Sequence, residues 1–215
     1  MTVQLYLWDI PKSKIPFAIF KMASNRIYLK SNKSISFFKL LGTGKGDTFT
    51  QNDANMQRWG LLVVGESVQN TGIVNRWRKI STRERFYELS PIASHGTWAK
   101  KKPFKVNSLN DPESEIAVIT RARIKFKLSK IFWRSVPPVV FNLKSSPGLK
   151  MAIGIGEAPV GLQGTFSLWE NAAALEKFAF KGEAHARVIK RTRELDWYSE
   201  ELFARFEVKI GRAHV

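Results

Sequence analysis

Three histidines supply every imidazole in this sequence, and there is no cysteine to add a thiolate ligand. His185 is the candidate of interest because it shares the apolar side of a helical pattern with residues three, four and seven positions away. Those residues are Phe178, Gly182, Val188, Ile189 and Thr192. An imidazole in an apolar stripe, beside a glycine that leaves room, suits the axial position of a haem iron. The alternative is a hydrogen-bonded core histidine, which is the commoner role of a lone histidine on an apolar face.

The other two histidines are poor ligands, since His95 lies in a polar stretch and His214 lies next to the chain end. No second histidine or carboxylate stands at the spacing of a mononuclear iron or zinc site. The lack of cysteine excludes disulfides, thiolate-bound haem and cysteine-held iron–sulfur clusters. We therefore do not expect a metal that is held by protein ligands alone.

Two glycine-rich stretches fail the spacing rules for phosphate-binding loops. In the first, Gly44 and Lys45 are followed by Gly46 where a P-loop needs serine or threonine. In the second, residues 154–159, Pro159 stands where a dinucleotide fingerprint has its third glycine. Both stretches are predicted to be tight turns near a pocket, and no nicotinamide or flavin site is expected.

The charge balance favours an anionic partner. The chain has 35 Lys and Arg against 18 Asp and Glu, a net charge of +17, which would suit nucleic acid, an anionic membrane surface or an acidic protein. Residues 121–134 mix cations with aromatic rings, but no recognised nucleic-acid motif is present, so no specific nucleic acid is expected. Residues 1–11 do not resemble a secretory signal, and no apolar run has the roughly 20 residues of a spanning helix. We expect a cytoplasmic protein that can contact an anionic membrane peripherally.

Hydrophobic periodicity predicts the same order of elements twice. In the first half we expect strands at 3–8, 35–41, 59–65 and 95–106, and helices at 15–26 and 71–87. A polar linker follows at 107–114. In the second half we expect strands at 116–126, 149–155, 164–169 and 202–210, a helix at 127–143 interrupted by Pro137 and Pro138, and a helix at 171–193 with a break near Gly182.

This order predicts an α+β protein made of two tandem ferredoxin-like βαββαβ repeats, at residues 1–110 and 115–215. The bare faces of the two sheets would pack together as a dimeric α+β barrel within one chain. The space between sheet and helices would then suit a flat apolar ligand. The alternative is two separate ferredoxin-like domains with no shared pocket.

Several blocks of sequence resemble one known family in the same order along nearly the whole chain. The blocks are 38–46 with 48–50, 58–62, 120–122, 154–159, 165–169 and 185–206. Together they are similar to the spheroidene monooxygenase family of carotenoid biosynthesis. The resemblance implies a dimeric α+β-barrel-like fold and a haem b monooxygenase that inserts a keto group into an acyclic carotenoid. It also implies molecular oxygen as co-substrate and a separate electron donor such as ferredoxin.

The resemblance raises His185 to the expected iron ligand and makes the second repeat the haem-binding half. Arg121 becomes a candidate for a haem propionate or for polarising bound oxygen. The expected pocket walls are Phe166, Trp169, Phe178 and Trp197, together with Gly182, Val188 and Ile189 on the histidine's helix face.

Two other functions stay open. One is a haem enzyme of another class, such as a dehydratase or a peroxidase-like enzyme, which a short closed cavity would favour. The other is a non-catalytic basic binding protein, which would take up no haem and would bind nucleic acid in a strongly salt-dependent way. The sequence leaves the oligomeric state open.

Overall fold

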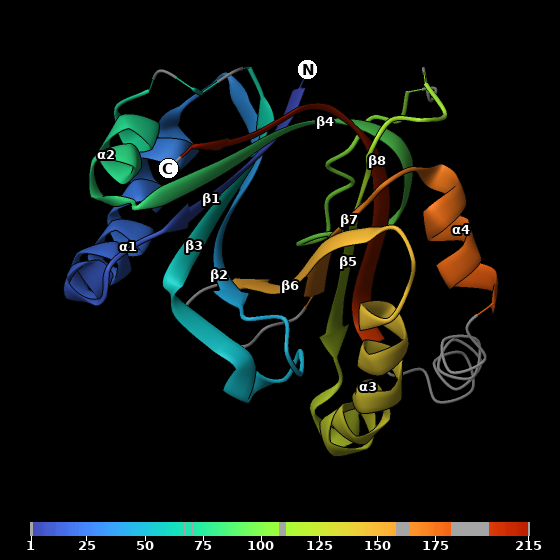
Figure 1. Cartoon of the computed structure of the whole chain (residues 1–215). Coiled ribbons are helices and arrows are strands. Elements are labelled where there is room, and N and C mark those ends of the chain that lie inside the picture. Colours follow the sequence, from blue (N-terminus) through green and yellow to red (C-terminus); the bar gives the residue numbers. More distant parts are fainter. Residues whose placement is uncertain are drawn as a thin grey trace.

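The computed structural model describes residues 2–66, 68–69, 71–107, 111–157, 164–181 and 198–214, and it has the order β-α-β-β-α-β twice (Figure 1). The first repeat consists of β1 (Thr2–Asp9), α1 (Ile15–Ser31), β2 (Ile35–Gly44), β3 (Ala54–Gly65), α2 (Gly72–Ile80) and β4 (Arg83–Gly96). The second consists of β5 (Ile116–Ile124), α3 (Ser129–Lys144), β6 (Leu149–Glu157), β7 (Gly164–Trp169), α4 (Ala172–Lys181) and β8 (Tyr198–His214). The predicted α+β class and tandem βαββαβ repeats are confirmed.

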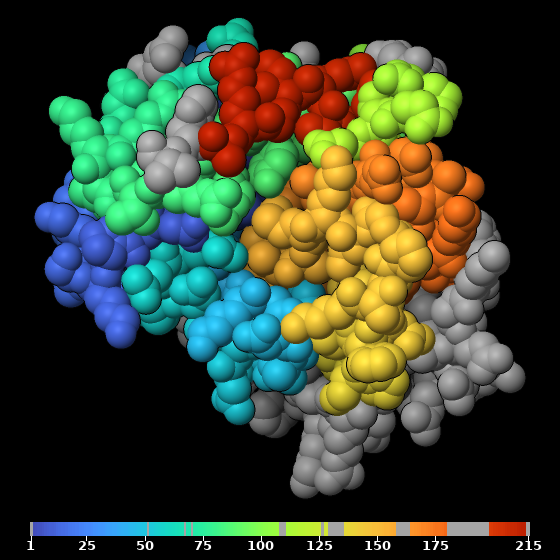
Figure 2. Space-filling view, viewed as in Figure 1, coloured from blue at the N-terminus to red at the C-terminus, as the bar shows by residue number. Residues whose placement is uncertain are grey.

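All eight strands form one closed antiparallel barrel in the order β1-β3-β2-β6-β7-β5-β8-β4. Each repeat supplies four neighbouring strands in the ferredoxin-like order, β4-β1-β3-β2 and β8-β5-β7-β6. Helices α1 and α2 cover the outside of the first repeat, and α3 and α4 cover the outside of the second (Figure 1). Figure 2 shows the blue and green first repeat packed against the yellow and orange second repeat.

Two seams join the repeats, and they differ in length. Strands β4 and β8 pair from Glu84↔His214 to Gly96↔Leu202, with two irregularities on the way. Among the residues that the structure describes, strands β2 and β6 pair from Leu41↔Glu157 to Thr43↔Ile155. Within the described residues the barrel is therefore closed by one long seam and one shorter seam.

Alternation of side chains builds two apolar layers on every strand. In β1, Leu5 and Leu7 point into the barrel, whereas Tyr6 and Trp8 point outward beneath the helices. The interior is filled by side chains from all eight strands, including aromatic rings such as Phe166. The barrel interior is thus a packed core.

The last two elements of the first repeat were predicted wrongly. Helix α2 ends at Ile80 instead of residue 87, and β4 occupies Arg83–Gly96 instead of 95–106. Strand β4 was missed because it contains charged residues, which look exposed in sequence but are paired with other residues inside the fold. Glu84 binds Arg78 and the Trp8 indole, and Arg85 binds Asp9.

The second repeat agrees more closely with its prediction. Strand β7 matches residues 164–169, while β8 is longer than the predicted 202–210. Helix α3 (Ser129–Lys144) contains Pro137 and Pro138, so the predicted interruption of this helix is wrong. Helix α4 ends at Lys181, and residues 182–193 of the predicted helix lie outside the described residues.

Candidate functional site

The predicted site residues are only partly within the described chain. Arg121, Phe166, Trp169 and Phe178 are described. The other five lie outside the described residues and stay predictions: Gly182, His185, Val188, Ile189 and Trp197.

The four described candidates lie on two different faces of the sheet. Arg121 and Phe166 point into the barrel, where Phe166 packs 5.5 Å from the ring of Tyr87. Trp169 and Phe178 belong to the layer between the sheet and the helices, and their rings stack with centroids 5.2 Å apart. The structure therefore does not gather these four side chains in one pocket.

Arg121 is the centre of a buried polar cluster at one end of the barrel interior. Its side chain is only 3% exposed, and it forms an ion pair with Glu200. A second guanidinium nitrogen, Nη2, lies 3.5 Å from Glu157 Oε1, and the indole of Trp98 lies 5.8 Å from the guanidinium carbon. Nη2 makes no hydrogen bond with any described residue, so its contact with Glu157 is an ion pair without a hydrogen bond.

A glycine on the neighbouring strand positions Arg121. Gly164 of β7 pairs with Arg121 of β5 in the sheet register. A Cβ atom at Gly164 would lie 2.5 Å from the carbonyl oxygen of Thr120 and 3.2 Å from the Cα of Arg121. Because a backbone carbonyl cannot move aside as a flexible side chain can, only glycine permits this close approach.

Glu200 is held as a carboxylate by three donors. It accepts hydrogen bonds from the Lys100 amide at 2.7 Å, from the Thr97 hydroxyl at 3.0 Å and from Arg121. Burial raises the pKa of Glu200, but these donors outweigh burial and lower the pKa to about 2. Glu200 therefore stays ionised opposite Arg121 at any physiological pH.

Glu157 is the second carboxylate of the cluster. It pairs with Lys39 at 2.7 Å and accepts a hydrogen bond from the Trp98 indole at 2.8 Å. Burial opposes ionisation, yet these two donors and the nearby Arg121 guanidinium leave the pKa of Glu157 below its ordinary value. Two cations thus face two carboxylates, and the charges of the cluster balance.

Sequence reasoning found Arg121 but missed its partners. Lys39, Trp98, Glu157 and Glu200 come from four distant segments, so no spacing rule connects them. One signal was present in the sequence. Arg121 continues the inward series of Ala117 and Ile119 on β5, and a cation at an inward position requires carboxylate partners.

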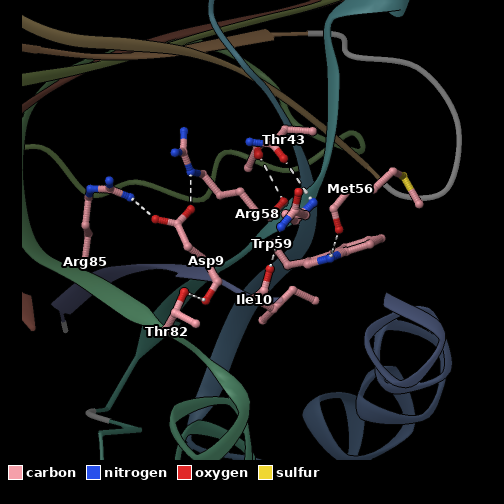
Figure 3. Close-up of polar contacts among 10 residues, drawn as sticks. Asp9, Ile10, Thr43, Met56, Arg58, Trp59, Thr82 and Arg85 are labelled. Atoms are coloured by element: carbon pink, nitrogen blue, oxygen red, sulfur yellow. Dashed lines mark hydrogen bonds and ion pairs between the residues drawn. The ribbon is translucent and has the colours of Figure 1, made fainter. Parts of the chain in front are cut away.

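The opposite end of the barrel interior has a simpler ion cluster, shown in Figure 3. Asp9 binds Arg58 at 2.6 Å through one carboxylate oxygen and Arg85 at 2.9 Å through the other. Its backbone carbonyl accepts hydrogen bonds from the amide and hydroxyl of Thr82. All three charged side chains keep partial exposure, whereas the Arg121 side chain at the other end is only 3% exposed.

The strand registers allow the two repeats to be compared residue by residue. Leu7 pairs with Gly60 in the first repeat, and Arg121 pairs with Gly164 in the second. These positions correspond, because the next helix begins eight residues later in both repeats, at Ile15 and at Ser129. The remaining equivalences follow along the strands. On the helix-facing side, the first repeat has Tyr6, Trp8, Leu40, Leu61 and Val63. The equivalent residues of the second repeat are Thr120, Ala122, Gly154, Thr165 and Ser167, which we call the small-residue face.

In the first repeat, large side chains fill this layer. Trp8 stacks on Trp77 of α2 with ring centroids 5.2 Å apart, and Tyr6 stacks on Trp8 at 5.3 Å. In the second repeat, Thr120 is exposed and Ala122 is half-buried. The aromatic pair Trp169 and Phe178 borders the small-residue face, and the Trp169 indole donates to Ser167 at 3.0 Å. Three neighbouring strands of the second repeat therefore carry small side chains where the first repeat carries large ones, next to a stacked pair of aromatic rings.

The described residues offer no alternative metal centre. Among them, no three His, Cys, Asp or Glu side chains come together in a way that could hold a metal ion. His95 is largely exposed, and its nearest acidic partner is Glu201 at 4.0 Å. None of the described helices is long and apolar enough to span a bilayer.

Comparisons with known proteins place this geometry in context. No protein-family model matches the chain. In the solved structures, an aldoxime dehydratase crystallised with butyraldoxime has a TM-score of 0.58 at 10% identity, covering 96% of this chain and 79% of that one. A likeness at this level of identity concerns the fold alone.

Similarity in sequence is more specific. The spheroidene monooxygenase of Rhodobacter capsulatus is 31% identical over 205 residues, which cover 91% of this chain and 85% of the relative. The spheroidene monooxygenase of Cereibacter sphaeroides is 31% identical over 196 residues, which cover 87% of this chain and 60% of the relative. With such identity along nearly its whole length and a barrel of two ferredoxin-like repeats, the chain belongs to the spheroidene monooxygenase family.

Proposed function

We propose that this protein is a haem-dependent monooxygenase that inserts oxygen, as a keto group, into an acyclic carotenoid. Membership of the spheroidene monooxygenase family supports the reaction class and the substrate class. The structural observation that supports the proposal is the small-residue face, because its small side chains would leave room for a flat group where Tyr6 and Trp8 fill the first repeat.

Haem b would lie on the helix-facing side of the second repeat, with His185 as the iron ligand. Trp169 and Phe178 would contact the edge of the macrocycle, and Gly182, Val188, Ile189 and Trp197 would complete the walls. When bound, the haem supplies oxygen activation, with electrons from a separate donor such as ferredoxin. The net charge of +17 would favour encounter with an acidic donor.

The described residues would act by packing and by orientation. Phe166 lies on the other side of the sheet from Trp169, so it would support the floor from within the barrel. Arg121 is already paired with two carboxylates, so we assign it a positioning role in place of a direct contact with a propionate or with oxygen. The aromatic and aliphatic walls would exclude water from an apolar substrate.

Haem binding is the direct test. The protein is purified after expression with haem supplied, and its absorption spectrum is recorded. His185→Ala should lose most of the haem absorption, whereas His95→Ala should keep it, because His95 is exposed. A His185→Ala protein with full haem content and an unchanged spectrum would remove His185 from the proposal.

Activity is tested with an acyclic carotenoid, oxygen and a ferredoxin system, and the keto product is identified by mass spectrometry. Appearance of the product only with haem, oxygen and reductant together supports the proposal. Haem uptake without any oxidation of carotenoids would instead favour a haem enzyme of another class, and binding of nucleic acid without haem uptake would favour the basic binding protein.

A further inference from the structure

Helix α1 turns an apolar face toward solvent. Its inner side packs on the sheet through Ala18, Met22, Asn25 and Leu29, which are spaced three or four residues apart and are buried. On the opposite side, Phe20 is 63% exposed and Ile27 is 76% exposed. These two residues are seven positions apart, so they lie on one line along the helix. Phe17, Ile19 and Tyr28 add further exposed apolar surface.

Cations flank this apolar line on both sides. At 100° per residue, Lys21 projects to one side of the line, and Arg26 and Lys30 project to the other. The Lys21 ammonium lies 5.3 Å from the ring of Phe17 and 5.4 Å from the ring of Phe20. An apolar crest with cations on both sides is a surface that suits the plane of a membrane interface.

The surrounding segment has positive charge only. Between Asp9 and Asp47 the sequence contains eight Lys and Arg and no acidic residue. Arg26 and Lys30 also line a hollow of about 350 Å³ between the end of α1, β2 and the segment after β4. Lys39, Lys101 and Glu157 line it too, so four cations face one carboxylate, which pairs with Lys39. This hollow suits an anionic headgroup beside the apolar crest.

We propose that α1 is an in-plane anchor that docks the protein on an anionic phospholipid bilayer. Phe20 and Ile27 would enter the acyl region, and the flanking cations would meet lipid phosphates. A second copy of this chain is a poor partner for the face, because it would bring two sets of eight cations together without an acidic residue from the segment. The inference rests on the surface of α1 and not on the proposed function.

The lack of cysteine makes a direct test possible, since one introduced cysteine can be labelled alone. We would label Ile27→Cys with an environment-sensitive nitrobenzoxadiazole dye and, as the control, Phe141→Cys on α3, where Phe141 is 74% exposed. With vesicles of phosphatidylcholine and phosphatidylglycerol, emission should shift to the blue at position 27 and not at position 141. No shift at position 27, or equal shifts at both positions, would overturn the proposal.

Vesicle flotation gives the second test. Wild-type protein should float with phosphatidylglycerol vesicles and much less with pure phosphatidylcholine. The double variant Phe20→Glu with Ile27→Glu should lose about tenfold or more in vesicle affinity, while Phe141→Glu should bind like wild type. Thermal unfolding confirms that each variant is folded. Undiminished vesicle binding by the double variant would overturn the proposal. It would also be overturned if neither protein bound vesicles and the wild type formed a dimer that the double variant could not form.

Discussion

The two repeats have one topology but fill their outer layers differently. The first repeat packs Tyr6 and Trp8 against α2, and the Trp8 indole is anchored to Glu84 at 2.7 Å. At the equivalent positions, the second repeat has Thr120 and Ala122. The first repeat therefore gains stability from aromatic packing that the second repeat does not have at these two positions.

The barrel interior differs between the repeats in the opposite sense. Leu7 of the first repeat is apolar, while the equivalent Arg121 carries a network of ion pairs. The repeat with the smaller side chains at these outward strand positions is thus the one whose inward position carries the Arg121 ion pairs. The comparison teaches that one repeat serves mainly as scaffold and that the other is the place to look for a ligand.

The largest effect is expected when the second repeat is filled like the first. Thr120→Tyr combined with Ala122→Trp places the side chains of the first repeat on the small-residue face. We expect a folded protein that no longer takes up haem or oxidises carotenoid, as measured by absorption spectrum and product analysis. Phe141→Trp, at an exposed site on α3, is the control and should have no effect. Unchanged haem uptake in the double variant would mean that haem does not bind at the small-residue face.

The reverse experiment empties the first repeat. Trp8→Ala removes a fully buried ring and its stacking on Trp77, so we expect a loss of about 3–5 kcal/mol in the free energy of unfolding. Denaturant titration measures this loss. The equivalent change in the second repeat, Ala122→Gly, should cost only about 0.5–1 kcal/mol. Equal losses for both variants would mean that the two layers are packed alike.

The Arg121 cluster should make stability depend on acid. Glu200→Gln leaves a buried guanidinium short of a partner, at a cost on the order of 3 kcal/mol at neutral pH. The pKa of Glu200 is lowered from 4.5 to about 2, so its contribution is complete above pH 4.5 and is lost as the pH falls toward 2. Unfolding curves across this range should show a shallower loss for the variant. Glu201→Gln, at a half-exposed site, is the control and should behave like wild type.

The other end of the barrel should respond more weakly. Asp9→Asn removes the carboxylate that bridges Arg58 and Arg85, all three being partly exposed. We expect a loss of about 1–2 kcal/mol that becomes smaller at high salt, because solvent-accessible ion pairs are screened. A loss larger than that of Glu200→Gln would reverse the ranking of the two ends.

Local sequence patterns were enough to predict most of the fold. Strand β7 and the inward series of β1 follow from alternation, and repetition of the element order revealed the barrel. Strand β4 was missed because Glu84 and Arg85 look like surface charges in sequence, although both are paired within the fold. Pairing across the sheet is not visible to a local pattern.

The candidate site was less predictable than the fold. Trp169 and Phe178 do meet, but alternation within β7 alone would have placed Phe166 on the opposite face, and that signal was not used. The partners of Arg121 come from segments as far apart as Lys39 and Glu200, which only the closed barrel brings together. The contrast between Trp8 and Ala122 is present in the sequence, but it emerges only once the strand registers fix the equivalences.

The two seams between the repeats, β4–β8 and β2–β6, are unequal, so the barrel wall is weaker along β2–β6. Within the described part of the chain, pairing between β2 and β6 covers Leu41 to Thr43, and the side-chain bridge from Lys39 to Glu157 reinforces it. Among the described pairs, β4 and β8 share many more than β2 and β6, so local opening of the barrel would start at the β2–β6 seam. The two repeats would then separate along β2 and β6 while the β4–β8 pairing holds them together.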